Sequence, residues 1–118
     1  MKKDNSFYEF VVSDLFAEIS GITSVSMFGG LGIYKEGIFF ALIFDGELYF
    51  KADDINRANY ENAGSHPFVY QGKNKPITLS YWLLPEEIME DETKLREWVD
   101  AAVEASKRSK ASKSSKKK

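Results

Sequence analysis

The sequence predicts a two-layer α+β fold, in which helices pack against one antiparallel sheet of about five strands. Apolar residues recur every three or four positions near both ends of the chain, as on one face of a helix, and form short runs in the middle, as in strands. Asp45-Gly46 stands between two apolar runs, which is the strongest short signal for a hairpin and therefore for antiparallel pairing. The expected element order is α-β-β-β-α-β-β-α.

The first helix is predicted over residues 7–19, within "SFYEFVVSDLFAEIS". Gly21 suits the position that ends a helix, where a left-handed backbone is needed. The apolar face that would turn inward consists of Phe7, Phe10, Val11, Leu15 and Ile19.

Three strands are expected next, in "SVSMFGGLGIY" (24–34), "IFFALIF" (38–44) and "ELYFKA" (47–52). A two-residue turn at Asp45-Gly46 places Phe44 opposite Glu47 and Leu42 opposite Tyr49. The alternate face is wholly apolar and is the predicted core face. Its members are Phe39, Ala41, Ile43, Leu48 and Phe50.

The second half of the chain predicts a short helix, two strands and a final helix. Asp53 or Asp54 can cap the short helix, which would hold Ile55, Ala58 and Asn59 and end at Gly64. The strands are "PFVYQG" and "PITLSYWLL", the latter with Ile77, Leu79, Tyr81 and Leu83 on one face. The last helix starts at Pro85, restarts near Asp91 and turns inward Leu95, Trp98, Val99, Ala102 and Val103.

Composition places the chain among globular proteins with one domain. It has 118 residues, 43% of them hydrophobic, and no cysteine, which excludes disulfides and thiolate chemistry. The N-terminus lacks a hydrophobic signal core, and the longest apolar run, "IFFALIF", is too short to span a bilayer. We expect a cytoplasmic protein that does not contact membranes.

Charge divides the chain into an acidic domain, residues 1–106, and a basic tail, residues 107–118, which is expected to be disordered. The tail carries seven of the 16 basic residues and no acidic one, so the domain has nine basic against 18 acidic residues, a formal −9. The tail could bind nucleic-acid phosphates without sequence preference, or could be a solvated end that aids solubility. Its candidate residues are Lys107, Arg108, Lys110, Lys113, Lys116, Lys117 and Lys118.

The glycines of "GGLG" (29–32) do not form a phosphate loop, because a strand pattern follows them and no G-K-[ST] is present. Within a strand, glycines mark a bulge or the close approach of another group. Here they would leave room for large neighbours such as Phe40, Leu42 and Phe44, so the second face of the sheet is also apolar. A helix or a partner must cover such a face. The candidate interaction residues are Phe28, Gly30, Gly32, Tyr34, Phe40 and Trp82.

Nothing in the sequence predicts catalysis or a cofactor. His66 is the single histidine, and no His or Cys cluster has the spacing of a transition-metal site. The carboxylates of "EEIMEDE" are more typical of a charged helix face than of a divalent-ion site. The paired Asp53 and Asp54 are typical of a helix cap, and no serine stands in a nucleophile elbow. We therefore expect no enzyme, no cofactor, no metal and no small-molecule ligand.

Two stretches resemble the N-terminal domain of the TfoX/Sxy family of bacterial competence regulators: "MFGGLGIYKEGIFFALIFDGELYFKAD" and "NRANYENAGSHPFVYQGKNKPITLSYWLLPEE". The resemblance covers most of residues 7–105. It implies an α+β fold like that of secretion chaperones and a role near transcriptional activation of DNA-uptake genes, through protein contacts with a cyclic-AMP-responsive activator. The family commonly has a basic residue where this chain has Ser26. Its full-length members add a C-terminal helix-hairpin-helix domain, so we expect a stand-alone N-terminal domain here.

The sequence thus predicts a non-enzymatic protein-interaction module that docks a protein partner or a second copy through its sheet face, with a role in transcription or competence. The alternative is a nucleic-acid accessory protein held by its basic tail. A third interpretation, an uncharacterised enzyme, would need a pocket with convergent polar groups.

Overall fold

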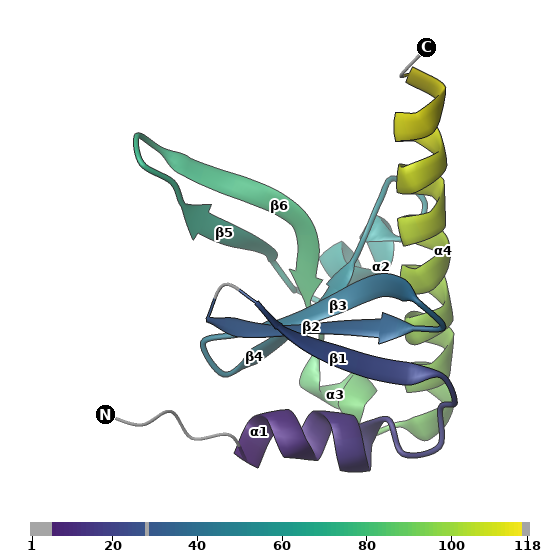
Figure 1. The fold of residues 1–118 in the computed structure, drawn as a ribbon. Coiled ribbons are helices and arrows are strands. Elements are labelled where there is room, and N and C mark those ends of the chain that lie inside the picture. The colour runs from purple at the N-terminus through teal and green to yellow at the C-terminus, as the bar shows by residue number, and fades with distance from the viewer. Residues whose placement is uncertain (1–5, 28, 117–118) are drawn as a thin grey trace.

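The computed structural model describes residues 6–27 and 29–116, with side chains up to residue 110. One sheet carries six strands, and helical segments precede, interrupt and follow them (Figure 1). In chain order the elements are α1 (Ser6–Glu9), η1 (Phe10–Leu15), β1 (Ile22–Met27), β2 (Gly30–Lys35), β3 (Ile38–Phe44), β4 (Glu47–Lys51), α2 (Arg57–Asn62), β5 (Pro67–Gln71), β6 (Pro76–Leu83), α3 (Glu86–Met89) and α4 (Glu92–Lys116).

The sheet is antiparallel throughout, with strand order β1-β2-β3-β4-β6-β5, and this confirms the predicted α+β class. Its six strands exceed the expected five because the segment predicted as one strand, residues 24–34, forms both β1 and β2. Met27 pairs with Gly30, so the chain reverses between these two strands. Gly29 has φ 78°, a left-handed conformation that glycine adopts at little cost.

Two hairpin turns fix the register of β2, β3 and β4. Asp45 and Gly46 have φ 55° and 77°, and Glu36 and Gly37 have φ 50° and 83°. Positive φ at both central residues is the turn geometry that matches the twist of paired strands. As predicted, Phe44 lies opposite Glu47 and Leu42 opposite Tyr49.

A β-bulge in β3 changes which side chains reach the core. Ile33 pairs with Ala41, but the preceding pair is Tyr34 with Phe39, which leaves Phe40 as the extra residue. Phe40 is fully buried and packs its ring 5.9 Å from that of Phe16 and 5.5 Å from that of Phe50. The prediction was therefore wrong for two residues: Phe40 belongs to the core, and Phe39 lies on the opposite face beside Tyr34.

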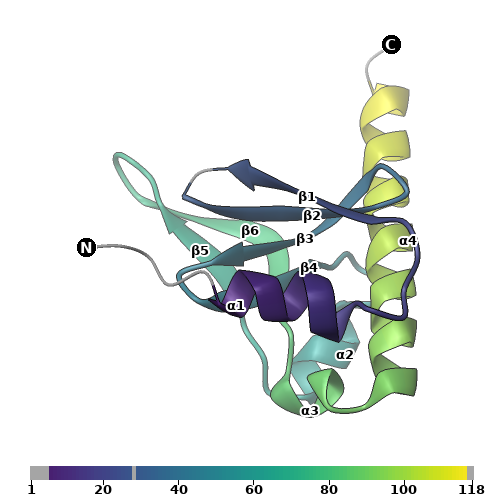
Figure 2. The same cartoon turned by 60° about the horizontal axis from the view of Figure 1, so that its bottom comes forward.

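The core lies between the first face of the sheet and the helices, chiefly α4, η1 and α2 (Figure 2). Predicted core residues of the sheet, Ala41, Ile43, Leu48 and Phe50, are fully buried, as are most predicted inward residues of α4. No helix within the described ranges is long and apolar enough to cross a membrane.

The first helix departs from its predicted geometry. The backbone N–H of Phe16 donates to the carbonyl of Val11, 3.0 Å away, which is the five-residue spacing of a π-helix. Val11 and Phe16 therefore point inward together, whereas Phe10, predicted on the inner face, is 42% exposed. The short helix also differs from its prediction, because Ile55 precedes α2 and is exposed, whereas Tyr60 is the buried residue of α2.

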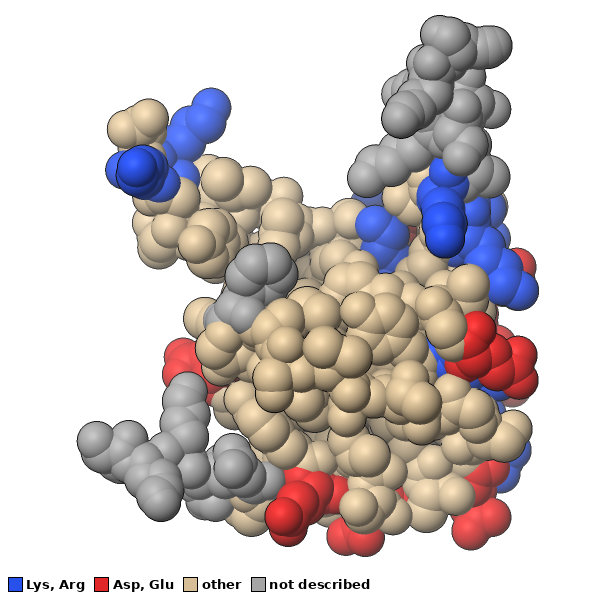
Figure 3. All heavy atoms as spheres, viewed as in Figure 1, with Lys and Arg blue, Asp and Glu red and all other residues tan. Residues whose placement is uncertain are grey.

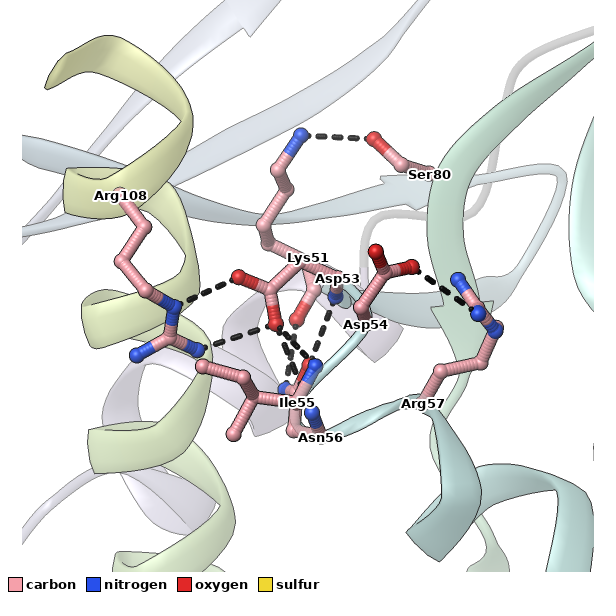
Figure 4. Close-up of polar contacts among 8 residues, drawn as sticks. All are labelled: Lys51, Asp53, Asp54, Ile55, Asn56, Arg57, Ser80 and Arg108. Carbon is pink, nitrogen blue, oxygen red and sulfur yellow. Dashed lines mark hydrogen bonds and ion pairs between the residues drawn. The ribbon is translucent and has the colours of Figure 1, made fainter. Parts of the chain in front are cut away.

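The carboxylate of Asp53 joins the loop after β4 to the last helix (Figure 4). Its Oδ1 accepts the backbone N–H groups of Ile55 and Asn56, at 3.0 and 3.4 Å, which caps the turn that leads into α2. On its other side Arg108 donates from Nε to Oδ2 at 2.7 Å and from Nη2 to Oδ1 at 3.0 Å. A bidentate pair of this kind fixes direction as well as distance, so it holds α4 against the loop.

The last helix continues through the segment that composition assigned to the tail. α4 extends to Lys116, and the disorder expected from residue 107 stays a prediction. The Ser106 hydroxyl donates to the carbonyl of Phe39 at 2.7 Å, and Arg108 binds Asp53. These two contacts attach the start of the basic segment to the domain. The domain boundary after residue 106 stays a prediction.

Two glycines of β2 are needed for close packing. A Cβ atom at Gly30 would overlap the carbonyl oxygen of Ile43 in the neighbouring strand, which cannot move without breaking the sheet. A Cβ atom at Gly32 would lie 2.5 Å from the Met27 methyl and 3.1 Å from a Phe39 ring carbon, both of them side-chain atoms. The expected close approach is thus to backbone at Gly30 and to side chains at Gly32.

Gly30→Ala is expected to lower the free energy of unfolding by about 2–3 kcal/mol, because overpacking against backbone shifts a strand. Gly32→Ala is expected to cost less, since the end of the Met27 side chain can rotate away. Denaturant unfolding followed by circular dichroism measures both. Equal losses for the two variants would contradict this distinction.

Arg108→Gln is expected to lower the free energy of unfolding by about 1 kcal/mol at neutral pH. The expected loss is small because the Arg108 side chain is partly exposed and solvent weakens its ion pair. The Arg108 hydrogen bonds lower the pKa of Asp53. The ion pair therefore stabilises the fold above the ordinary Asp pKa of about 4 and loses this effect as the pH falls through the lower folded-state value.

Urea unfolding at a series of pH values from neutral to acidic should show the wild-type and Arg108→Gln curves converging at low pH. Arg57→Gln is the control, because Arg57 binds Asp54 and Glu61 in exposed surface pairs. A constant offset between wild type and Arg108→Gln at every pH would show that the ion pair does not act through Asp53.

Candidate protein-interaction surface

The β5–β6 hairpin stands away from the rest of the sheet (Figure 1). Residues 81–83 of β6 pair with β4, whereas the pairs nearer the hairpin tip join β6 only to β5. The register shifts between Pro67 and Val69, which marks the point where the hairpin departs. The hairpin therefore forms an arm that overhangs the second face of the sheet, opposite the core.

A pocket of about 320 Å³ lies between this arm and the second face, and we call it the apolar pocket. Its lining residues come from β1, β2 and β3 on the sheet side and from β5 and β6 on the arm. They are Met27, Gly30, Phe39, Leu42, Ile43, Phe44, Phe68, Tyr70, Leu79 and Tyr81. None of these described lining residues is charged. An exposed apolar hollow of this kind is typical of an interaction site.

Aromatic contacts shape both ends of the apolar pocket. At one end Phe68 of the arm packs its ring 5.3 Å from that of Phe44. At the other end the Phe39 ring lies 5.2 Å from that of Tyr34 and 5.6 Å from that of Tyr81. These contacts fix the spacing between arm and sheet, so the hollow is built by packing rather than left by a loop.

A second hollow, the lysine pocket, adjoins the first and shares Phe39 and Tyr81 with it. It lies where the sheet meets the C-terminal half of α4. Its lining residues are Tyr34, Gly37, Ile38, Phe39, Lys51, Tyr81, Ser106, Lys107, Ser109 and Lys110.

The structure gives the contacts of the Lys51 ammonium and the protonation of the Tyr81 hydroxyl in the lysine pocket. The Lys51 ammonium donates to the Ser80 hydroxyl at 2.6 Å and lies 5.3 Å from the centre of the Tyr81 ring (Figure 4 shows the Ser80 contact). Burial, with a smaller effect of Tyr34, raises the pKa of Tyr81 to about 12. The Tyr81 hydroxyl therefore stays protonated at neutral pH and remains a hydrogen-bond donor.

Three of the predicted interaction residues gather at these hollows. Gly30 lines the apolar pocket, Gly32 lies beneath Met27 and Phe39, and Tyr34 lines the lysine pocket. Phe28 lies outside the described residues.

The remaining two predicted interaction residues face the core side. Phe40 is buried there by the bulge, and Trp82 packs its ring 6.2 Å from that of Tyr60. Trp82 sits one position after Tyr81, and alternation along β6 sends the two side chains to opposite faces.

Sequence reasoning did not select the residues of the arm. Tyr81, Leu79, Phe68 and Tyr70 line the apolar pocket. The shared face of Leu79 and Tyr81 was visible from alternation alone. Nothing local in the sequence indicates that this face folds back over β3, because that depends on the departure of the hairpin from the sheet.

The predicted nucleic-acid residues of the tail differ in what their side chains contact. Lys107 and Lys110 are exposed and line the lysine pocket, with Lys107 also 3.5 Å from Glu104. Arg108 is bound to Asp53 and faces the domain. The side chains of Lys113, Lys116, Lys117 and Lys118 lie outside the described part of the chain.

Groups that could support catalysis are dispersed. His66 is exposed at the start of β5, where its Nδ1 lies 3.2 Å from the carbonyl of Pro67. Among the described residues, no three His, Asp or Glu side chains come together in a way that could hold a metal ion.

Comparisons with known proteins agree with the resemblance found in the sequence. The chain is 28% identical over 104 residues to the DNA transformation protein TfoX1 of Aliivibrio fischeri (strain ATCC 700601 / ES114), which covers 88% of this chain and 47% of that protein. The chain therefore spans about half the length of the curated relative it matches. The model of the TfoX N-terminal domain family matches residues 14–106, which is most of the chain. The protein belongs to the TfoX N-terminal domain family.

Proposed function

We propose that the chain is a non-enzymatic protein-interaction module that takes part in the regulation of DNA uptake, and that the apolar pocket is its docking surface. The observation that carries the proposal is the pocket itself. Its lining is apolar, its walls are fixed by aromatic packing, and the described lining residues offer no charged group for chemistry. The free energy of the complex falls when an apolar side chain of another protein replaces water in such a hollow.

The family relationship supports the regulatory part of the proposal. A relative with detectable similarity over most of this chain is named for DNA transformation. A docking module could influence the transcription of DNA-uptake genes. It would act by binding a partner protein rather than by modifying it chemically.

A second candidate function, binding of single-stranded nucleic acid, is favoured by one observation. The lysine pocket combines Lys51, Lys107 and Lys110 with the rings of Tyr34 and Tyr81. Cationic side chains beside aromatic rings are the elements of a stacking site for single strands.

Two neighbouring residues of β5 provide a matched test of the docking surface. Tyr70 is 50% exposed and lines the apolar pocket, whereas Val69 is 45% exposed and does not line it. Tyr70→Glu places a charge at the pocket, while Val69→Glu places the same charge on the same strand outside it. Leu79→Asn, also at the pocket, serves if Tyr70→Glu fails to fold.

In the bacterium that encodes the chain, Tyr70→Glu is expected to lower transcription of DNA-uptake genes and transformation frequency by about tenfold or more, the effect of losing one central docking contact. Val69→Glu is expected to match the wild type. Thermal unfolding of both purified variants checks that each is folded. The proposal fails if Tyr70→Glu and Val69→Glu act alike, or if deletion of the gene leaves DNA uptake unchanged.

A further inference from the structure

The two hollows form one groove. They share Phe39 and Tyr81, and the rings of Tyr34, Phe39 and Tyr81 follow one another at 5.2 and 5.6 Å between centres. The floor of the groove is therefore continuous from beneath the arm to the side of α4. An occupant that fills both hollows would cross the rings of Phe39 and Tyr81.

Positive charge lies in two places beside this groove, in the lysine pocket and at the tip of the arm. Lys51, Lys107 and Lys110 line the lysine pocket, and its described lining contains no Asp or Glu. The connection between β5 and β6 adds the exposed Lys73 and Lys75 at the tip of the arm. Figure 3 shows basic atoms both at the tip of the arm and along the C-terminal half of α4, on either side of the uncharged surface.

The negative charge of the domain is concentrated elsewhere. The hollow between η1 and the start of α4 is lined by Asp14, Glu18, Glu90 and Glu92, with Arg96 as its single basic residue among those described. Figure 3 shows acidic atoms along that lower end of the molecule. The groove nevertheless presents Lys51 of the acidic domain together with Lys107 and Lys110 of the basic segment, and these cations attract carboxylates over distances of about 10 Å.

The two hollows together favour a peptide over a nucleic-acid strand. Met27, Leu42 and Leu79 give the apolar pocket an aliphatic as well as an aromatic lining, which suits a large apolar side chain. A nucleobase would leave the polar atoms of its edge unpaired there, at a cost that stacking alone does not offset. A peptide can place an apolar side chain in the hollow and keep its charged groups outside.

We propose that the occupant of the groove is an acidic amphipathic segment of a partner protein, with a large apolar side chain in the apolar pocket and carboxylates beside Lys107, Lys110 and Lys51. This inference rests on the proposed docking function and names the partner's chemistry. The groove also gives the segment a direction. Asp45 and Glu47 follow Phe44 at the far end of the β3–β4 hairpin, so the carboxylates of the segment face α4 and its other end lies toward the turn.

A defined peptide library tests this chemistry. Short peptides with a central Leu or Phe and flanking positions drawn from Asp, Glu, Lys, Arg, Ser and Ala are displayed and selected on the full chain. The expected result is enrichment of Asp and Glu on one side of the central residue. Tyr70→Glu is expected to abolish the selected binding, and Val69→Glu to leave it unchanged.

A pair of charge reversals on one helix then tests where the carboxylates lie. Lys110→Glu, in the lysine pocket, is expected to weaken binding of a selected acidic peptide about fivefold and to reduce its salt dependence. Lys94→Glu makes the same change at an exposed position of α4 outside the pocket and is expected to leave the affinity unchanged.

Three outcomes would overturn the inference. Selected peptides without acidic enrichment that still depend on Tyr70 would refute the acidic chemistry and leave the docking function standing. Binding of an oligothymidylate strand, with no peptide selected, would favour the nucleic-acid function. A dimer in light scattering that Tyr70→Glu converts to a monomer would show that a second copy fills the groove. If instead acidic peptides bind the groove while Tyr70→Glu leaves DNA uptake intact, the inference holds and the regulatory proposal fails.

Discussion

The β-bulge at Phe40 is the feature on which both faces of the sheet depend. In an unbroken strand Phe39 and Phe40 would point to opposite faces, with Phe39 in the core. The extra residue turns Phe40 inward against Phe16 and Phe50 and releases Phe39 to the second face. The same backbone segment presents the Phe39 carbonyl to Ser106 of α4, which ties the helix to the sheet at this point. One inserted residue thus completes the core, provides the shared floor of both hollows and positions α4 beside them.

The groove is assembled from segments that lie far apart in the sequence. The arm supplies its outer wall, β2 and β3 supply the floor, and β4 and α4 supply the lysines. Gly30 allows β2 and β3 to approach closely beneath the floor, and the bidentate contact of Arg108 with Asp53 holds α4 at the edge. Gly30, Arg108 and Asp53 therefore support the surface, whereas Tyr70, Leu79 and Lys110 line it where a partner would dock. Changes in the first group should disturb the fold before they disturb binding.

Local signals in the sequence predicted most of the fold. The Asp45-Gly46 turn, the register it imposes and the inward face of α4 all follow from turn chemistry and periodicity, and the structure confirms them. The failures occur where an inserted residue shifts the period. The π-helical spacing between Val11 and Phe16 and the bulge at Phe40 each move a side chain to another face, and nothing in the local pattern marks either insertion. The split of residues 24–34 into two strands was missed because Gly29 was read as part of a strand rather than as a turn.

The candidate surface was predictable only in part, for a related reason. The glycines and Tyr34 indicated an apolar second face, and that face exists. Its concavity depends on the arm, whose departure from the sheet at Pro67 is a tertiary feature. Net charge was equally misleading, because the sum of −9 over residues 1–106 leaves out Lys107 and Lys110, which border the groove together with Lys51. The position of charge in the fold, rather than its total, decides what kind of partner can approach.

The most direct test of this account is to locate the binding surface by methyl NMR of the full chain. The spectrum would be recorded with the peptide that the chain selects most strongly, whatever its sequence. The account predicts the largest shifts at the methyl groups of Met27, Leu42 and Leu79, which line the apolar pocket. Shifts confined to Leu15 and Leu95, which line the acidic hollow between η1 and α4, would contradict it.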